Sequence, residues 1–162
     1  MAITRLNNNS LTSITALPSG VGGKLGQIVT TSFTLDQDRS ETSLTELNSS
    51  CRVTITPSAT SSKILYLISF PFRAPSSNNG FFINIFKSVG GASYADDSGE
   101  LSRYAGYGGA GTGGEYRTFS TQYLDSPNTT SAIIFTPYIK VSSSTINFGN
   151  NGKFNATVME IK

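Results

Sequence analysis

The side chains that most often do chemistry in proteins are sparse in this sequence. The 162 residues include no histidine and a single cysteine, Cys51. Without histidine the chain cannot form a Ser–His–Asp or Cys–His nucleophile system or a two-histidine zinc motif. Cys51 alternates with Val53 and Ile55, which favours a buried small apolar residue over a reactive thiol. We therefore expect a protein that is not an enzyme and that holds no metal or cofactor.

Two groups of carboxylates could offer oxygen ligands to a calcium ion. The first is Asp36 with Asp38, and the second is Asp96 with Asp97 and Glu100. Neither group matches a twelve-residue calcium loop with spaced ligands and a closing glutamate. The spacing favours the alternative, in which these residues form solvated turns that keep exposed strand ends from pairing.

A glycine-rich stretch, residues 103–116, contains a G-x-G-x-x-G motif at Gly106, Gly108 and Gly111. In a dinucleotide-binding fold this motif follows a strand and opens a helix whose N-terminus holds the pyrophosphate. Here the motif leads into a strand-like run, so the pattern favours a long loop at one end of a β domain.

Three tyrosines flank these glycines, namely Tyr104, Tyr107 and Tyr116. Tyrosines between small residues form adaptable contact surfaces and lose little side-chain entropy on binding. We regard them as candidates for contact with a glycan or protein ligand. The alternative is that they only cap the edge of the fold.

Composition and charge narrow the class of protein. Serine and threonine make up about a quarter of the chain, well above average usage. Charged residues are 14%, and the aromatic fraction of 10% is too high for a disordered chain. The net charge is +2, with the basic residues scattered singly, so no stripe exists to neutralise a row of phosphates. No apolar run approaches the length of a membrane span, so we expect binding to neither nucleic acid nor membrane.

Short runs with strand-like alternation recur along the chain, separated by clusters of Ser, Pro, Asn and Gly. These runs are residues 27–35, 43–48, 51–57, 62–72, 80–88, 115–125, 131–141, 144–149 and 153–162. Such a series predicts an all-β fold in which two antiparallel sheets pack face to face. The last run ends close to Ile161, which predicts a central strand that is paired on both sides.

Two of these runs are apolar on both faces. Leu65 and Leu67 alternate with one set of apolar residues, and Phe82 and Phe86 alternate with another. A strand with one face in water alternates apolar with polar residues instead. We therefore expect a second copy of the chain to cover these four side chains. The alternative is that the chain's own long loops cover them.

The first residues of the chain fit neither a helix nor a strand. Isolated apolar residues occur here at Ile3, Leu6, Leu11, Ile14 and Leu17. Their spacing gives no continuous apolar face, and no apolar run resembles that of a signal peptide. A segment of this kind can lie across another protein and place each apolar side chain in a small pocket. We expect residues 1–26 to form an extended anchoring arm and residues 27–162 to form the β domain.

Residues 53–70, VTITPSATSSKILYLISF, resemble a repeat in structural proteins of tailed bacteriophages, especially marine ones. In that group a short leader rich in Ser, Thr and Asn also precedes a compact jelly roll. A terminal strand deep in the sheet is similar to the trimeric jelly rolls of tumour necrosis factor and complement C1q. The resemblance implies a two-sheet antiparallel jelly-roll sandwich with an extended N-terminal arm. It also implies a homotrimer, assembled in the host cytoplasm and exposed on the surface of a virion.

These observations together predict a non-enzymatic structural protein of a phage particle, either a capsid decoration (cement) protein or a head fibre. Its partners would be itself and another virion protein, such as the major capsid protein or a tail protein. The alternative is a tail-fibre or receptor-binding tip module in which the tyrosine–glycine loop contacts a host glycan or protein.

Overall fold

A computed structural model describes residues 25–74, 80–99, 101–105, 115–142 and 144–162. The expected anchoring arm therefore lies almost entirely outside the described residues. Within them, the regular structure is β-strand apart from one 3-10 turn, η1 (Ser49–Cys51). No helix in this part of the chain is long and apolar enough to cross a membrane.

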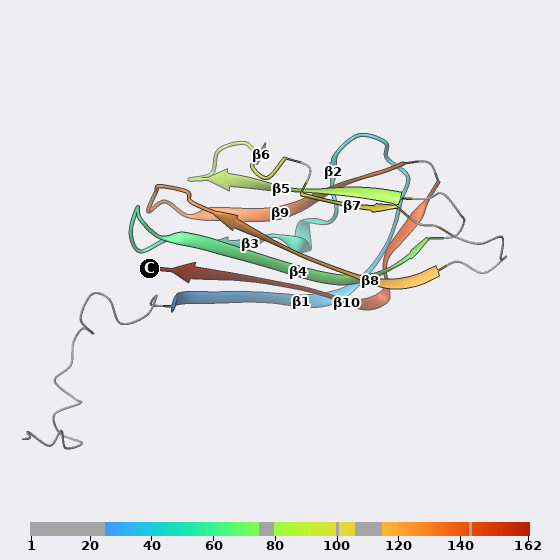
Figure 1. The fold of residues 1–162 in the computed structure, drawn as a ribbon, viewed down its shortest axis with the longest axis horizontal. Helices are drawn as coiled ribbons and strands as arrows, with labels where there is room; N and C mark the ends of the chain where they lie inside the picture. The colour runs from blue at the N-terminus through green and yellow to red at the C-terminus, as the bar shows by residue number, and fades with distance from the viewer. Residues whose placement is uncertain (1–24, 75–79, 100, 106–114, 143) are drawn as a thin grey trace, which may run out of the picture.

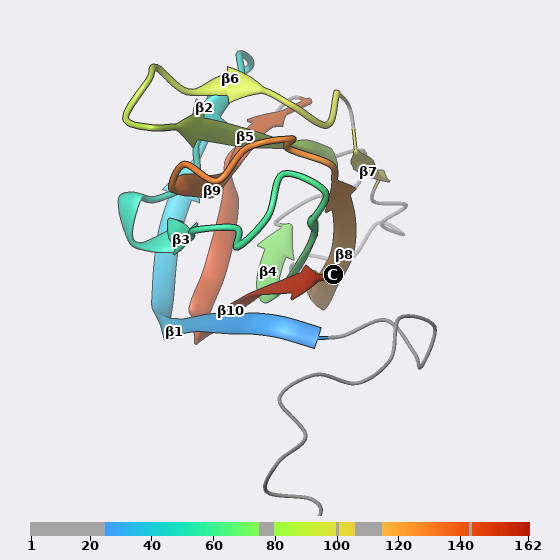
Figure 2. The same ribbon diagram turned by 90° about the vertical axis from the view of Figure 1, so that its left-hand side faces the viewer.

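The strands form two antiparallel sheets that pack as a sandwich (Figures 1 and 2). One sheet has the order β1 (Leu25–Arg39), β10 (Ile146–Ile161), β4 (Lys63–Ala74) and β8 (Glu115–Asp125). The other has the order β2 (Thr45–Glu46), β9 (Ile133–Val141), β5 (Gly80–Val89) and β6 (Ala95–Asp96). In this second sheet β3 (Val53–Ile55) also pairs with β9, and β7 (Ser102–Ala105) also pairs with β5.

The strand order is that of a jelly roll. When the two-residue strands β2 and β6 are set aside, the sheets read β1-β10-β4-β8 and β3-β9-β5-β7. From β7 to β10 each consecutive strand lies in the opposite sheet, as the crossing connections of a jelly roll require. The predicted fold class is confirmed. The final strand β10 lies between β1 and β4, which confirms the prediction that it is central.

Alternation along the strands builds the core between the two sheets. On β4 the residues Ile64, Tyr66, Ile68, Phe70 and Phe72 point inward and are at most 2% exposed. Phe70 lies in the middle of an aromatic cluster, with ring centroids 5.3 to 6.3 Å from those of its neighbours Phe81, Phe119, Phe148 and Phe154. Burial of each such side chain contributes about 1.5–3 kcal/mol, so this cluster is a main source of stability.

The sequence predicted two strands, residues 144–149 and 153–162, separated by a turn, and this prediction is wrong. The structure has one strand, β10, with a bulge at Gly149, Asn150 and Asn151, whose φ angles are +93°, +42° and +61°. On the neighbouring strand, a single residue spans this stretch between the partners of Phe148 and Gly152. Gly and Asn residues of this kind predict a reversal of the chain, but here their left-handed conformations only push three residues out of the ladder.

Other strands differ from the prediction in extent. Of residues 43–48 only Thr45–Glu46 are strand, and residues 51–57 begin within η1 before the three residues of β3. The strands β6 and β7 were not predicted. Their segments are short and do not alternate, and they are strands because β5 offers them a free edge. Tertiary pairing here overrides weak local preference.

A buried carboxylate joins the end of β10 to the turn that precedes β4. Glu160 is fully buried, and its Oε1 atom accepts hydrogen bonds from Ser58 N (2.7 Å), Ser58 Oγ (2.6 Å) and Ser62 Oγ (2.7 Å). Burial alone raises the pKa of this carboxyl, but these bonds and one from the Gln27 backbone outweigh it and lower the pKa to about 2. The serines of the PSATSSK turn therefore have a structural task, which is to hold this anion.

Candidate interaction surface

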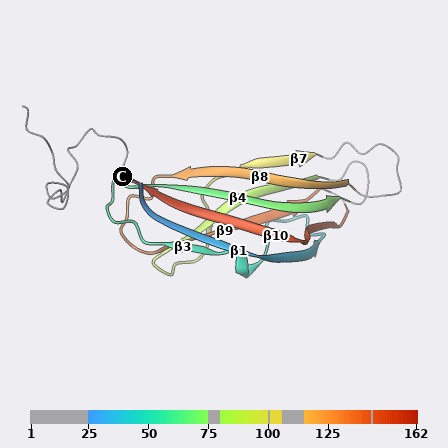
Figure 3. The same ribbon diagram turned by 90° about the horizontal axis from the view of Figure 1, so that it is seen from below.

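The outer face of the four-stranded sheet carries rows of side chains that run across all four strands. Figure 3 shows this sheet from below, with β1, β10, β4 and β8 in front. The register places Ile28, Met159, Leu65 and Leu124 next to one another in one row. At the end of the sheet the next row contains Leu25 and Ile161. We call these six residues the apolar rows.

The apolar rows account for most of the large apolar surface that the described residues expose. Leu25, Ile28 and Leu124 are 56%, 53% and 51% exposed. The remaining exposed large residue of the described chain, Tyr116 at 64%, lies on the same face at the opposite end of the sheet. Single exposed apolar residues are normal, but a row of four adjacent ones indicates a contact surface.

A bulge at the start of β1 brings Leu25 and Ile28 to the same face. The register shifts between these two residues, so the usual alternation does not place them on opposite sides. Gly26 lies within the bulge and faces the core, where a Cβ atom would lie 2.5 Å from Glu160 Oε2. The glycine therefore lets the bulge form beside the buried carboxylate.

The polarity of this face changes along the strands. Next to the apolar rows, Leu67 pairs with Thr157 and Gln122. Two rows from Leu65, the cross-strand neighbours are Ser32, Asn155, Ser69 and Ser120, and Ser32 Oγ donates to Asn155 Oδ1 at 2.8 Å. The face thus runs from apolar, through hydroxyl and amide groups, to a charged end.

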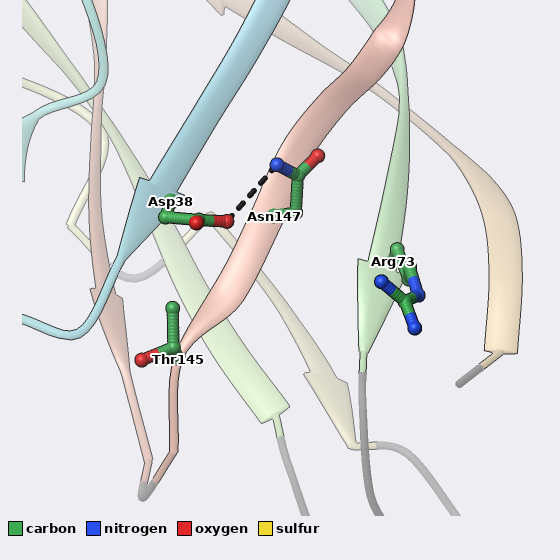
Figure 4. A pocket seen from close by; sticks show the side chains of 4 residues that line it. All are labelled: Asp38, Arg73, Thr145 and Asn147. Atoms are coloured by element: carbon green, nitrogen blue, oxygen red, sulfur yellow. Dashed lines mark hydrogen bonds between the residues drawn. The ribbon is translucent and has the colours of Figure 1, made fainter. Parts of the chain in front are cut away.

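The charged end contains a row formed by Asp38, Asn147, Arg73 and Tyr116. A cavity of about 190 Å³ opens here, lined by Asp38, Arg73, Thr145 and Asn147 (Figure 4). We call it the β1–β10–β4 pocket. Asp38 and Asn147 face each other, and Arg73 lies on the other side of Asn147.

Asn147 is held in one orientation by three hydrogen bonds. Its Nδ2 donates to Asp36 Oδ1 (2.8 Å) and Asp38 Oδ1 (2.9 Å), and its Oδ1 accepts from the backbone N–H of Asn150 (2.8 Å). Asn150 belongs to the left-handed bulge of β10. The bulge therefore fixes the amide that shapes the pocket.

Arg73 brings a cation to the pocket. Its guanidinium lies over the ring of Tyr116, with the Cζ atom 5.5 Å from the ring centroid. Its Nε is buried and has no hydrogen-bond partner among the described residues. A buried guanidinium donor without a partner is costly.

The four residues predicted for a subunit interface lie on opposite faces of the sandwich. Leu65 and Leu67 are on the outer face of the four-stranded sheet, half-buried. Phe82 and Phe86 are on the outer face of the other sheet, also half-buried. Phe86 stacks on Tyr138 with centroids 3.8 Å apart, and Lys140 Nζ lies 4.6 Å from the centroid of Phe82. Side chains of the same protomer therefore contact both phenylalanines.

The structure places few of the other predicted contact residues. Tyr116 lies on β8 and is largely exposed. Tyr104 is within β7, but its side chain is outside the described residues, as is all of Tyr107. The predicted anchoring residues also lie outside the described residues, namely Ile3, Leu6, Leu11, Ile14 and Leu17.

The acidic residues considered for calcium bind other groups of the chain. Asp97 pairs with Lys87 (2.7 Å) and accepts a hydrogen bond from Tyr123 OH (2.7 Å). Asp96 accepts from Asn84 Nδ2 at 2.6 Å, and Glu100 lies outside the described residues. No group of three or more possible metal ligands occurs in the part of the chain that the structure describes.

Cys51 is fully buried, as the sequence predicted. Burial raises the pKa of its thiol far above the ordinary value. This side chain therefore packs as a small apolar group.

Comparisons with known proteins add little to this picture. No family model matches the sequence, and no curated protein matches it. Among solved structures, one similar chain comes from the structure of infectious bursal disease virus, Gx strain. The match has 12% sequence identity and a TM-score of 0.28, and it covers 85% of this chain and 40% of the viral chain. At these values the similarity does not establish a shared fold or function.

Most residues of the apolar rows and of the pocket were not predicted from the sequence. Ile28, Leu124 and Met159 were not predicted as contact residues, because each looks like an isolated apolar residue in its own strand. Arg73 and Asn147 also gave no signal, because strand register, which the sequence does not show, brings them together. The one available signal was that Leu65 is apolar on the outer side of a strand. This signal identified one residue of the row but not its neighbours on the other three strands.

Proposed function

We propose that this chain is a non-enzymatic structural protein of a tailed-phage particle. In this proposal it associates with copies of itself, as a homotrimer, through the outer face of the four-stranded sheet. Residues 1–26 attach it to another virion protein, such as the major capsid protein. The observation that carries the proposed self-association is the row formed by Ile28, Met159, Leu65 and Leu124 across four strands.

The apolar rows suit contact with a second protein surface. They lie on the outer face of the four-stranded sheet, and their exposed leucine and isoleucine side chains are adjacent rather than scattered. Burial of such side chains is the main driving force of protein association. The position of Leu25 in these rows also places the end of the proposed arm next to the proposed contact.

The viral assignment rests on the resemblance of residues 53–70 to phage structural proteins and on the jelly-roll strand order. Within that segment, the structure gives Ser58 and Ser62 a role in holding the fold. The proposal of three copies rests on the resemblance to trimeric jelly rolls.

Self-association is tested by the mass of the full chain in solution. We expect light scattering to give three times the 17.2 kDa of one chain. Leu124→Asp should give monomers. Leu124 is half-exposed in one copy, so the change removes about 1 kcal/mol of burial per contact and places a carboxylate in an apolar contact, which costs about 2 kcal/mol more. Each contact should then weaken by more than about 100-fold.

Ser120→Asp is the matched control, because Ser120 is exposed on the same strand and face but belongs to the hydroxyl row. It should leave the mass unchanged. A wild-type monomer at micromolar concentration would contradict the proposal, and so would equal dissociation by both variants.

The particle site is tested by imaging particles that carry the protein. Density for the β-sandwich at every icosahedral position would indicate a decoration protein, and a few copies at the tail would indicate a fibre. Absence of the protein from purified particles would refute the viral assignment without touching the self-association.

A further inference from the structure

We infer that the β1–β10–β4 pocket binds a pyranose unit of a saccharide. This goes beyond the structural function proposed above and does not depend on it, since the pocket lies at the opposite end of the sheet from the apolar rows. None of the four residues that line the pocket belongs to the glycine-rich loop that the sequence suggested as a ligand contact.

The charges of the pocket select the class of ligand. Asp38 lines one side and Asp36 lies next to it on the same strand, so a phosphate or other dianion would be repelled. Arg73 lines the other side, which disfavours a metal cation or an amine. Asp38 and Arg73 form no ion pair with each other in the described structure. A neutral ligand that both donates and accepts hydrogen bonds satisfies both sides.

The unused hydrogen-bonding capacity matches neighbouring hydroxyl groups. Asn147 has both amide hydrogens engaged by Asp36 and Asp38, and its Oδ1 accepts from the bulge, so it has no donor left for a ligand. Asp38 keeps a second carboxylate oxygen that can accept from a hydroxyl group. Arg73 lines the other side of the pocket, and its guanidinium can donate to the oxygen of an adjacent hydroxyl group.

An aromatic ring next to the pocket favours a sugar over other polyols. Tyr116 is largely exposed, and its ring packs against the Arg73 guanidinium. Tyr116 follows Arg73 in the same cross-strand row, beside the pocket, where its ring can contact the C–H face of a pyranose. The volume of about 190 Å³ is enough for one ring of this kind and not for a long oligosaccharide. The remaining units of a polysaccharide would extend over the surface.

Chemical shifts of the full-length, isotope-labelled protein test this inference. The probes are the methyl pyranosides of glucose, galactose, mannose and N-acetylglucosamine, and inorganic phosphate serves as the anionic comparison. We expect at least one pyranoside to shift the amides of Asp38, Arg73 and Asn147 in a saturable way, with a Kd of about 1 mM. Phosphate should not shift them.

Variants then assign the binding. Arg73→Gln and Asp38→Asn should each weaken the binding by about tenfold or more, because each removes a hydrogen bond to a charged group. Glu41→Gln is the control for the loss of one carboxylate, because Glu41 is partly exposed, pairs with Arg39 and does not line the pocket. It should bind as the wild type does.

Three outcomes would overturn the inference. The first is that no pyranoside shifts these amides at about 10 mM, and the second is that phosphate binds there instead. The third is that Arg73→Gln leaves sugar binding intact and lowers the mass of the oligomer, which would assign the pocket to contact between copies. The first two leave the self-association proposal standing, so the two ideas can fail separately.

Discussion

The buried carboxylate of Glu160 joins the end of β10 to the turn that precedes β4, and replacing it tests how much this connection stabilises the fold. The side chain is fully buried and accepts three hydrogen bonds at Oε1 from Ser58 and Ser62. Glu160→Gln keeps the size of the side chain but removes the charge. It also puts an amide N–H₂ group at one of the two positions now held by carboxylate oxygens.

The expected loss follows from these bonds. A hydrogen bond to a charged group contributes about 1.5–3 kcal/mol, and a neutral one about 0.5–1.5 kcal/mol. Three bonds that each weaken by about 1 kcal/mol give a loss of about 3 kcal/mol, partly offset because a neutral side chain is easier to bury. For a chain of this length we expect Glu160→Gln to lower the Tm by about 5–10 °C at pH 7.

The pH dependence gives a second signature. The pKa of Glu160 falls from 4.5 to about 2 in the folded protein, so the folded state favours the ionised form. The stabilisation is complete above about pH 4.5 and is lost as the pH falls towards 2. The gap in Tm between wild type and Glu160→Gln should therefore be constant from pH 7 to pH 5 and narrow steadily below pH 4.5.

Thermal unfolding followed by circular dichroism at a series of pH values measures both effects. Glu41→Gln is the control, because Glu41 forms a partly exposed ion pair with Arg39. Its loss should change the free energy of unfolding by less than about 1 kcal/mol. A gap that stays the same down to pH 2.5 would refute the role of the charge. A Glu160→Gln protein as stable as the wild type at pH 7 would refute the role of the serine turn.

Three further predictions concern other parts of the chain. Gly149→Ala should lower the free energy of unfolding by about 2–4 kcal/mol in a denaturant titration, because the φ of +93° is strained for alanine and the added Cβ would overlap the Leu35 carbonyl. Gly91→Ala is the control. Its φ is +82° but the space around it is open, so it should lose only about 1 kcal/mol in the same titration. Lys87→Met should destabilise by about 3 kcal/mol, measured in the same way, because it leaves the buried Asp125 without its ion pair at 2.9 Å. Removal of residues 1–23 should change the Tm by no more than a few degrees yet abolish attachment to particles in a sedimentation assay, and normal attachment of the shortened chain would contradict the anchoring arm.

The long strands could be predicted from the sequence because each alternates with a clear inner face. Residues 62–72 show this best, since Ile64, Tyr66 and Phe70 are all buried on the predicted side. The prediction of a turn between residues 149 and 153 was wrong, because the same residue types are typical of a tight turn and of a bulge within a continuous strand. The GNNG segment has left-handed residues of the kind that make tight turns, but the strand continues past them because β1 pairs on both sides of the bulge.

The members of the candidate surface could not be predicted, because they come from four strands whose register is a property of the whole fold. Leu65 was found because its own strand has apolar residues on both faces. Ile28 shares a face with Leu25 only because a bulge intervenes, and nothing in a run of alternating residues reveals a bulge in advance. Arg73 and Asp38 are 35 positions apart, and only the central strand β10 brings them to one pocket.

The central position of β10 explains why so many of these features meet on one strand. Its outer residues provide Met159 and Ile161 to the apolar rows and Asn147 to the pocket, and its inward-facing Glu160 holds the serine turn. The bulge is what allows this, because it lets one strand pair with β1 on both sides of the extra residues. If β1 and β10 had equal numbers of residues across this stretch, the ladder would continue without a bulge. Asn147 would then lack the backbone N–H of Asn150 that orients it. The local irregularity in the strand is therefore the feature that positions the pocket, while the regular part of the same strand positions the apolar contact.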